Sequence, residues 1–379
     1  NYRSLRDLVL PLTHLNVVTG ANGSGKSNLY RSLRLLSETA RGTATASIAR
    51  EGGLSSVLWA GPEQLSAIVK RGEQPVQGGP RKNPVNLKLG FAGDEFSYAI
   101  DFGMPTPVPR TFFDKDPEIK REAIWHGPSW HDRRAMVDRR GAVVRARDDA
   151  GKWQVIEQHL PSYDSMLSRL ADPGRAPEAL VLREHIRSWR FYDHFRSDAD
   201  APARRPHIGT RTPALADDGN DLAAAWQTIR EIGDAEGLDA AVADAFPGAS
   251  VEVLVQNGVF ELEFKQHGLL RPLSQAELSD GTLRYLLWIA ALMTPRPPSL
   301  MVLNEPETSL HPDLLPALGR LMGQRADDTQ LWVISHAQPL IESLLRQGAN
   351  QLVLDKELSE TFVHDQDLFD KPAWKWPSR

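Results

Sequence analysis

Short apolar runs alternate with amphipathic segments at both ends of the chain. Near one end, residues 15–20 (LNVVTG) predict a buried strand, and residues 27–41 predict a helix with leucines on one face. Towards the other end, residues 299–304 and 329–335 predict buried strands, and residues 280–294, 312–326 and 338–347 predict helices. Continuous apolar strands between helices are typical of parallel sheets. The two ends therefore predict an α/β fold.

The middle of the chain has a different pattern. From about residue 85 to 160, polar and apolar residues alternate in short runs separated by glycine turns, which predicts a meander of hairpins. Residues 161–187 predict helices, and residues 197–219 predict a linker rich in Pro, Arg, Asp and Gly. Asn257-Gly258 predicts a hairpin turn, and residues 1–12 alternate like a further strand. We expect an insertion, β and then α, between two α/β halves.

Composition narrows the class of protein. A chain of 379 residues with 41% hydrophobic content is long enough for a large core. Its formal net charge of −5 gives no overall attraction to nucleic acid, and the absence of cysteine excludes disulfides and thiol catalysis. No apolar run approaches the ~20 residues of a membrane span. We expect a soluble, cytoplasmic protein without a membrane partner.

A glycine-rich segment follows the first buried strand. Residues 20–27 (GANGSGKS) match the pattern G-x-x-x-x-G-K-[ST] between a strand and a helix, as a phosphate-binding loop requires. Lys26 would contact the β- and γ-phosphates, and the hydroxyl of Ser27 would bind Mg²⁺. The full set of candidate ligands for ATP in this loop is Asn22, Gly23, Ser24, Gly25, Lys26, Ser27 and Asn28. The competing interpretation is a glycine-rich turn with a surface lysine.

A second candidate segment, residues 299–307 (SLMVLNEPE), is an apolar strand that ends in Asn304 and Glu305. Nucleotide hydrolases often carry Asp-Glu at this place, where the Asp holds a metal-bound water and the Glu orients the attacking water. Glu305 fits the second role. Asn304 offers an amide oxygen to the metal but no charge, so we expect weaker metal binding. The alternative is a strand end that is merely capped by polar residues.

These motifs resemble those of ABC-type ATPase heads, the group that includes the SMC chromosome proteins, the RecF-type ATPases and the OLD-like predicted ATPases. Besides the phosphate loop, LSDGTLR (278–284) resembles the signature motif, VLNEPETSLHP (302–312) resembles the Walker B strand with its D-loop, and WVISHA (332–337) resembles the switch-histidine strand. The resemblance covers residues 1–60 and 245–355 well and the middle weakly.

The resemblance implies an α/β fold of the P-loop NTPase type: an ABC-type head with a β-rich plus helical insertion lobe. Its parts would be residues 1–60, residues 61–245 as the insertion lobe, and residues 246–379, without a coiled coil or a nuclease domain. In such heads Ser279 and Gly281 would bind the γ-phosphate held by a second copy, which gives a homodimer with ATP at its interface. His336 would sense the γ-phosphate, and Arg3 would border the adenine.

Three departures from the family pattern stand out. Position 304 is Asn, and the signature has Asp280 where transporters have glycine. The glutamine loop has three candidates, Gln64, Gln74 and Gln77. The neutral Asn304 leaves open whether ATP is hydrolysed or only bound.

The insertion lobe carries arginine next to tryptophan, a combination suited to nucleic acid. One group comprises Arg133, Arg134, Arg139, Arg140, Arg145 and Arg147 near Trp125, Trp130 and Trp153, and a second runs from Arg183 through Arg187, Arg190, Arg196, Arg204 and Arg205 to Arg211. Interleaved acidic residues also fit a solvated hairpin face, so DNA or RNA binding and the solvated face both remain open.

The motifs and the family resemblance together imply three possible functions. The first is a Mg²⁺-dependent ATPase that acts as an ATP-sandwiched dimer in DNA repair or anti-phage defence. The second is a binding switch that hydrolyses ATP slowly or not at all and recruits a separate effector protein. The third, a transporter ATPase subunit, is disfavoured by the large insertion and the atypical signature.

Overall fold

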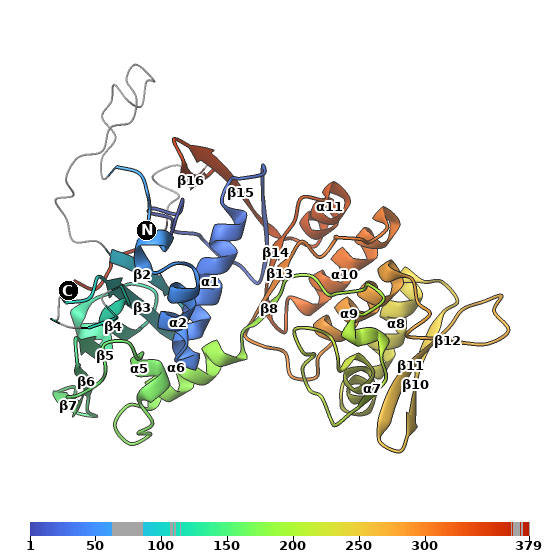
Figure 1. The fold of residues 1–379 in the computed structure, drawn as a ribbon, viewed down its shortest axis with the longest axis horizontal. Coiled ribbons are helices and arrows are strands. Elements are labelled where there is room, and N and C mark those ends of the chain that lie inside the picture. Colours follow the sequence, from blue (N-terminus) through green and yellow to red (C-terminus); the bar gives the residue numbers. More distant parts are fainter. Residues whose placement is uncertain are drawn as a thin grey trace. The chain divides into compact units, whose positions relative to one another are not determined.

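The structure is a computed structural model that describes residues 1–62, 86–106, 109, 111–113, 115–364, 366, 372 and 374–378. The chain divides into two compact units. Figure 1 shows the elements of both, coloured along the sequence. Unit 1 comprises residues 1–11, 20–188 and 354–379, and unit 2 comprises residues 12–19 and 189–353. The three-part division drawn from the sequence stays a prediction.

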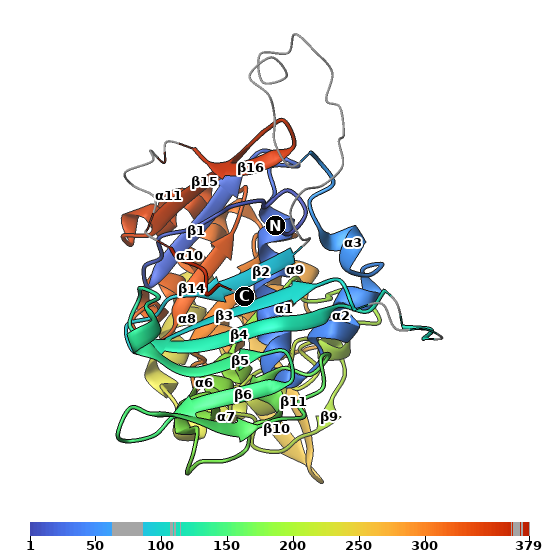
Figure 2. The same ribbon diagram turned by 90° about the vertical axis from the view of Figure 1, so that its left-hand side faces the viewer.

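Unit 1 is built on a six-stranded antiparallel sheet in which the strands follow one another in chain order, as Figure 2 shows. The strands are β2 (Asn86–Phe91), β3 (Phe96–Gly103), β4 (Glu118–His126), β5 (Ala135–Arg140), β6 (Val143–Arg147) and β7 (Trp153–Glu157). Alternating side chains and glycine turns favour such short connections. The expected meander of hairpins is confirmed.

Five helices belong to unit 1 in the part of the chain that the structure describes: α1 (Lys26–Arg41), α2 (Ala44–Arg50), α3 (Leu54–Val57), α5 (Met166–Arg169) and α6 (Pro177–Ser188). Helix α1 packs against α2, α5 and α6, and it contacts β2, while α6 contacts β5. Leu29 and Leu36 of α1 are buried, as the apolar face of this helix predicted. The helices therefore cover one face of the sheet.

The strand expected over residues 1–12 is not formed. In this segment Tyr2 only makes isolated bridges with Leu5 and Leu58. The backbone turns at once, because the N–H of Tyr2 donates to the carbonyl of Leu5 at 2.8 Å and Arg3 has a φ of 48°. The backbone N–H and C=O groups of Tyr2 and Leu5 bond to each other in a local turn, so they are not available to pair with a strand.

Unit 2 contains the parallel sheet expected from the two ends of the chain. Strand β14 (Gln330–Ile334) lies between β1 (Leu15–Gly20) and β13 (Leu300–Asn304), and β8 (Arg190–Tyr192) pairs with the far side of β13. All four strands are parallel, so their carboxyl ends meet at one edge. That edge carries Asp193 after β8, Glu305 after β13 and His336 beyond β14.

A smaller antiparallel sheet and five helices complete unit 2 among the described residues. The sheet contains β9 (His207–Ile208), β10 (Ser250–Gln256), β11 (Val259–Lys265) and β12 (Leu273–Ser274). The helices are α7 (Leu222–Ile232), α8 (Ala235–Ala245), α9 (Asp280–Leu292), α10 (Leu315–Arg325) and α11 (Gln338–Arg346). The predicted turn at Asn257-Gly258 is confirmed, with φ values of 51° and 78°.

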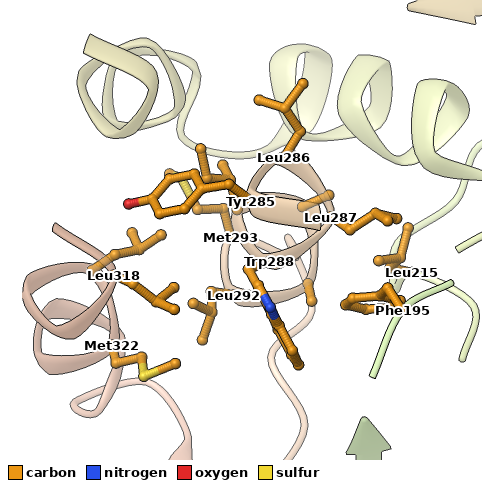
Figure 3. Close-up of a cluster of buried hydrophobic side chains, with 14 of the residues drawn as sticks. Phe195, Leu215, Tyr285, Leu286, Leu287, Trp288, Leu292, Met293, Leu318 and Met322 are labelled. Carbon is orange, nitrogen blue, oxygen red and sulfur yellow. The ribbon is translucent and has the colours of Figure 1, made fainter. Parts of the chain in front are cut away.

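Helix α9 is the centre of the core of unit 2. Its residues Tyr285 to Leu292 are all buried, and Figure 3 shows Trp288 packed beside Phe195 and Leu215. The rings of Phe195 and Trp288 lie 4.8 Å apart. Burial on all sides fixes this helix firmly, and with it the segment at its N-terminus.

The end of the described chain returns to unit 1. Strand β15 (Asn350–Glu357) begins in unit 2, and its later residues pair with β16 (Glu360–Val363) as an antiparallel hairpin in unit 1. No helix in the described part of the chain is long and apolar enough to cross a membrane.

Candidate functional site

The phosphate loop belongs to unit 1, and two of its glycines are required by space as well as by backbone conformation. Gly20 and Gly25 have φ values of 143° and 115°. A Cβ atom on Gly20 would lie 2.2 Å from the carbonyl oxygen of Leu354, and one on Gly25 would lie 2.3 Å from Oγ1 of Thr361. Only glycine fits such positions without displacing neighbours. The loop therefore has the tight, left-handed backbone expected of a phosphate cradle.

Lys26 closes over this loop. Its side chain is buried, and Nζ donates to the carbonyl oxygens of Gly20 at 2.5 Å and Ala21 at 3.1 Å. These acceptors are neutral, so a phosphate would be a stronger partner for the ammonium. Ser27 is exposed at the first turn of α1, as are Asn22 and Gly23 within the loop. The helix N-terminus adds its partial positive charge there.

A second layer supports the loop from behind. Oγ1 of Thr361, on β16, lies 2.7 Å from the carbonyl oxygen of Ser24 and 2.8 Å from Oγ of Ser4. Asn28 donates its side-chain amide to the same Ser4 hydroxyl at 2.8 Å. Asn28 thus braces the loop within unit 1. The supporting roles of Ser4 and Thr361 carried no motif and were not predicted.

Arg3 is held near the start of the chain. Its guanidinium pairs with Glu51 at 2.7 Å, and the hydroxyl of Tyr2 donates to the same carboxylate. Burial raises the pKa of Tyr2 above its ordinary range, so the hydroxyl remains a donor. The contact of Arg3 with adenine stays a prediction.

In unit 2, Asn304 has a carboxylate beside it. Its side-chain nitrogen donates to Oδ1 of Asp193 at 3.3 Å, because β8 and β13 run parallel and end together. The hydrogen bond fixes the orientation of the amide and leaves its oxygen as an acceptor. Asp193, directly after the neighbouring strand β8, therefore supplies the carboxylate that position 304 lacks, and no sequence motif indicated this.

Glu305 stands in a rare backbone conformation. Its φ is 50°, while its N–H donates to the carbonyl of Ile334 at 2.8 Å. Such a conformation in a residue other than glycine costs free energy and is concentrated at functional sites. Its carboxylate is 46% exposed and lies 3.9 Å from Nδ1 of His336. The structure thus brings the two predicted catalytic residues together at one sheet edge.

Glu307 fastens the segment that carries His336. One oxygen of its buried carboxylate accepts from Oγ of Ser335 at 2.8 Å and from the backbone N–H groups of His336 at 2.9 Å and Ala337 at 3.3 Å. Nδ1 of His336 also lies 3.3 Å from this carboxylate. The loop after β13 and the loop after β14 are thereby joined into one rigid element.

The signature segment begins α9. Oγ of Ser279 accepts from the backbone N–H of Thr282 at 3.2 Å, so this side chain caps the helix. A Cβ atom on Gly281 would lie 3.2 Å from the carbonyl oxygen of Ser309, so α9 closely approaches the D-loop. Ser279 itself is exposed.

Two buried arginines hold this segment. Arg204 pairs with Asp280 at 2.6 Å and donates to the carbonyl oxygens of Ala276 and Leu278. Arg284 donates to the carbonyl oxygen of Thr308 at 2.5 Å, and burial lowers the pKa of its guanidinium. Asp280 therefore serves as an anchor for Arg204, which explains an acidic residue where transporters have glycine.

Two of the arginines grouped as a basic surface are structural. Arg139 is fully buried against Glu122 at 2.8 Å, and Arg204 is buried as described above. Neither guanidinium is available to a nucleic acid in this structure. The glutamine-loop candidates Gln64, Gln74 and Gln77 lie outside the described residues.

The chain is similar to one protein family and to solved structures of Smc heads. A family model described as "AAA domain, putative AbiEii toxin, Type IV TA system" matches residues 15–341. An Smc head bound to the C-winged helix domain of ScpA aligns with a TM-score of 0.50 and 13% identity, over 96% of this chain and 94% of that chain. The SMC head domain from Thermotoga maritima aligns with a TM-score of 0.41 and 15% identity, over 96% and 94%.

No curated protein matches the sequence. The likeness to the Smc head bound to ScpA shows the fold, which is the α/β fold of an Smc head. The fold class expected from the sequence is confirmed.

Proposed function

Since the chain belongs to the family of AAA domains described as putative AbiEii toxins of type IV toxin–antitoxin systems, we propose that it is a Mg²⁺-dependent ATPase that binds and hydrolyses ATP. The observation that carries the proposal is the phosphate loop. Its left-handed glycines, buried Lys26 and exposed Ser27 at the start of α1 form the cradle that a triphosphate requires. Residues 22–28 would hold the phosphates of ATP.

The residues present fit Mg²⁺ by the chemistry of their donors. In unit 1 Ser27 offers a hydroxyl, and in unit 2 Asn304 offers an amide oxygen and Asp193 a carboxylate. Mg²⁺ prefers oxygen ligands and is usually bound through one or two protein groups together with substrate phosphates. When bound, the ion would neutralise charge that develops on the phosphates.

Glu305 and His336 would supply the remaining chemistry. The Glu305 side chain is 46% exposed at the sheet edge and would orient the attacking water and accept its proton. His336, fixed through Glu307, would contact the γ-phosphate. The rare backbone conformation of Glu305 supports a functional role, because folding stability alone gives no reason for its cost.

We further propose that two copies enclose ATP between them. The exposed N-terminus of α9, with Ser279 and Gly281, is suited to an anion that the phosphate loop of the other copy carries. Arg3 would border the adenine. In this proposal the chain acts in the cytoplasm, in DNA repair or anti-phage defence, and a separate effector protein acts with it.

A second function is favoured by one observation, the neutral side chain at position 304. Without a charge there, the closed dimer would hydrolyse ATP slowly or not at all and would serve as a switch that recruits a partner. Asp193 argues for hydrolysis, because it restores a carboxylate beside Asn304. A transporter subunit is the least supported alternative, since the insertion lobe and Asp280 depart from that pattern.

The proposal is tested with Lys26→Ala, Glu305→Gln and a control, Lys265→Ala, which removes an exposed lysine outside the site. ATP binding is measured by calorimetry, hydrolysis by phosphate release, and dimerisation by light scattering with and without ATP. We expect Lys26→Ala to abolish ATP binding, Glu305→Gln to trap an ATP-bound dimer, and the control to behave like the natural chain. A natural chain that fails to bind ATP contradicts the proposal.

A further inference from the structure

Outside the nucleotide site, the outer face of the antiparallel sheet in unit 1 contains a cavity of about 250 Å³. Five arginines line it: Arg121, Arg133, Arg140, Arg145 and Arg147. The register places Arg121 opposite Arg140 on neighbouring strands, so their side chains share a face of the sheet. The opposite face carries Glu122 and Arg139, which point towards α5. The cavity therefore faces away from the helices.

The cavity has an excess of positive charge. Asp132 and Asp138 are the acidic residues in its lining, so five guanidinium groups face two carboxylates, a formal excess of +3. This excess is local, because the whole chain carries −5. Like charges directly opposite one another on a sheet are unfavourable, and a bound anion would relieve that repulsion.

Asp138 holds three of the arginines in place. Its buried carboxylate pairs with Arg121 at 2.9 Å, Arg145 at 3.0 Å and Arg140 at 3.2 Å. The hydrogen bonds to Asp138 use one N–H group each of Arg140 and Arg145, and a guanidinium has five. The side chains of Arg140 and Arg145 are 52% and 37% exposed. Most of their donors therefore remain directed to an incoming ligand or to solvent.

Two indole rings pack against three of the five guanidinium groups. The guanidinium carbon of Arg121 lies 5.4 Å from the ring centre of Trp130. Those of Arg147 and Arg145 lie 4.5 Å and 5.3 Å from the ring centre of Trp153. One terminal nitrogen of buried Arg121 has no hydrogen-bond partner among the described residues, so Asp138 does not satisfy this guanidinium completely. Stacked and anchored arginines lose little freedom when they bind a ligand.

We propose that this cavity binds a phosphate group of a nucleic-acid strand. Planar guanidinium groups bind phosphate through paired hydrogen bonds. Sites that enclose a whole small ligand usually have a volume of about 300 Å³ or more. This cavity is smaller, so it suits one phosphate group of a longer molecule. Arg133 in the lining and Arg134 next to it in the chain are both exposed, and they extend the basic surface along which a backbone would continue. The inference deepens the proposed role on DNA and rests on it.

The test uses fluorescence anisotropy with a labelled 15-nucleotide oligo(dT), without ATP, on the complete chain. The variant is Arg140→Ala/Arg145→Ala. Its matched control is Arg169→Ala/Arg175→Ala, which removes two exposed arginines from the same unit, away from the cavity. We expect the cavity variant to bind at least tenfold more weakly and the control to change less than twofold. The slope of log affinity against log salt should fall by about 0.7 for each lost phosphate contact.

A second variant distinguishes a loss of binding from a loss of folding. Arg133 is exposed and forms no side-chain hydrogen bond or ion pair within the described residues, so Arg133→Ala should leave folding intact and weaken binding about threefold to tenfold. Equal losses in the cavity variant and the control, or no loss in Arg133→Ala, would overturn the proposal. Inorganic pyrophosphate that binds as tightly as the oligonucleotide would show that the ligand is a free phosphate compound and not a strand.

The outcome is independent of the nucleotide site. ATP hydrolysis without DNA is measured on the same variants, and we expect the natural rate, since none of these arginines belongs to that site. Lost oligonucleotide binding with normal hydrolysis supports the cavity. If no protein hydrolyses ATP, including the natural chain, the proposed ATPase activity is contradicted. The oligonucleotide binding data then still test the cavity by themselves.

Discussion

Glu122 lies at the centre of the buried polar network of unit 1. Its carboxylate is fully buried and accepts from the hydroxyl of Tyr98 at 2.7 Å, the hydroxyl of Ser165 at 2.5 Å, the N–H of Met166 at 2.8 Å and the guanidinium of Arg139 at 2.8 Å. Burial raises the pKa of Tyr98, which keeps its hydroxyl a donor. This network ties β4 and β5 to the start of α5.

The substitution Glu122→Gln removes the negative charge at nearly constant volume. Arg139 then stays buried with neutral acceptors only, among them the carbonyl oxygens of Gly141 and Pro161, each at 2.8 Å. Breaking a buried ion pair by changing one partner costs about 3–5 kcal/mol. Because Arg139 keeps these carbonyl partners, we expect the lower end, a loss of about 3 kcal/mol in the free energy of unfolding.

The assay is urea and thermal unfolding followed by circular dichroism. For a unit of about 200 residues, 3 kcal/mol corresponds to roughly 6–12 °C in the melting temperature. The matched control is Glu184→Gln on α6, where the side chain is 63% exposed, and we expect a change below about 0.5 kcal/mol. A loss below about 1 kcal/mol for Glu122→Gln would refute the structural role assigned to Arg139.

Two further predictions concern the nucleotide site. Gly25→Ala should weaken ATP binding at least tenfold in calorimetry, because its Cβ would meet Thr361 and its φ of 115° is strained for alanine; unchanged affinity would contradict the loop geometry. Asp193→Asn should lower the hydrolysis rate about tenfold and raise the Mg²⁺ concentration needed, since it removes the carboxylate beside Asn304. Equal Mg²⁺ dependence in the variant and the natural chain would show that Asp193 does not contribute to metal binding.

The sequence predicted those parts of the site that depend on local chain geometry. The phosphate loop and the strand that leads to Glu305 are each contained in one continuous segment, so a motif can report them. The support of Ser24 by Thr361 joins residues 337 positions apart, and no local pattern signals it. Such contacts follow from the topology, which short-range periodicity does not encode.

The arginines show the same limit in another way. From the sequence, Arg139 and Arg204 were grouped with the surface arginines because of their charge. In the folded chain both arginines are buried and each pairs with a carboxylate. The neutral Asn304 suggested a weakened site, because the sequence does not show that Asp193, 111 positions away in the chain, lies beside it. A residue's function at these positions depends on its neighbours in space, and these are unknown until the strands are paired.

The most direct test of the central claim is steady-state ATP hydrolysis with Mg²⁺, with and without DNA, by the natural chain, Asn304→Asp and Glu305→Gln. If Asp193 supplies the charge beside Asn304 and Glu305 activates water, the natural chain turns over, Asn304→Asp differs from it little, and Glu305→Gln loses at least 100-fold. If only Asn304→Asp turns over, the natural protein is an ATP-binding switch and the account of hydrolysis is wrong.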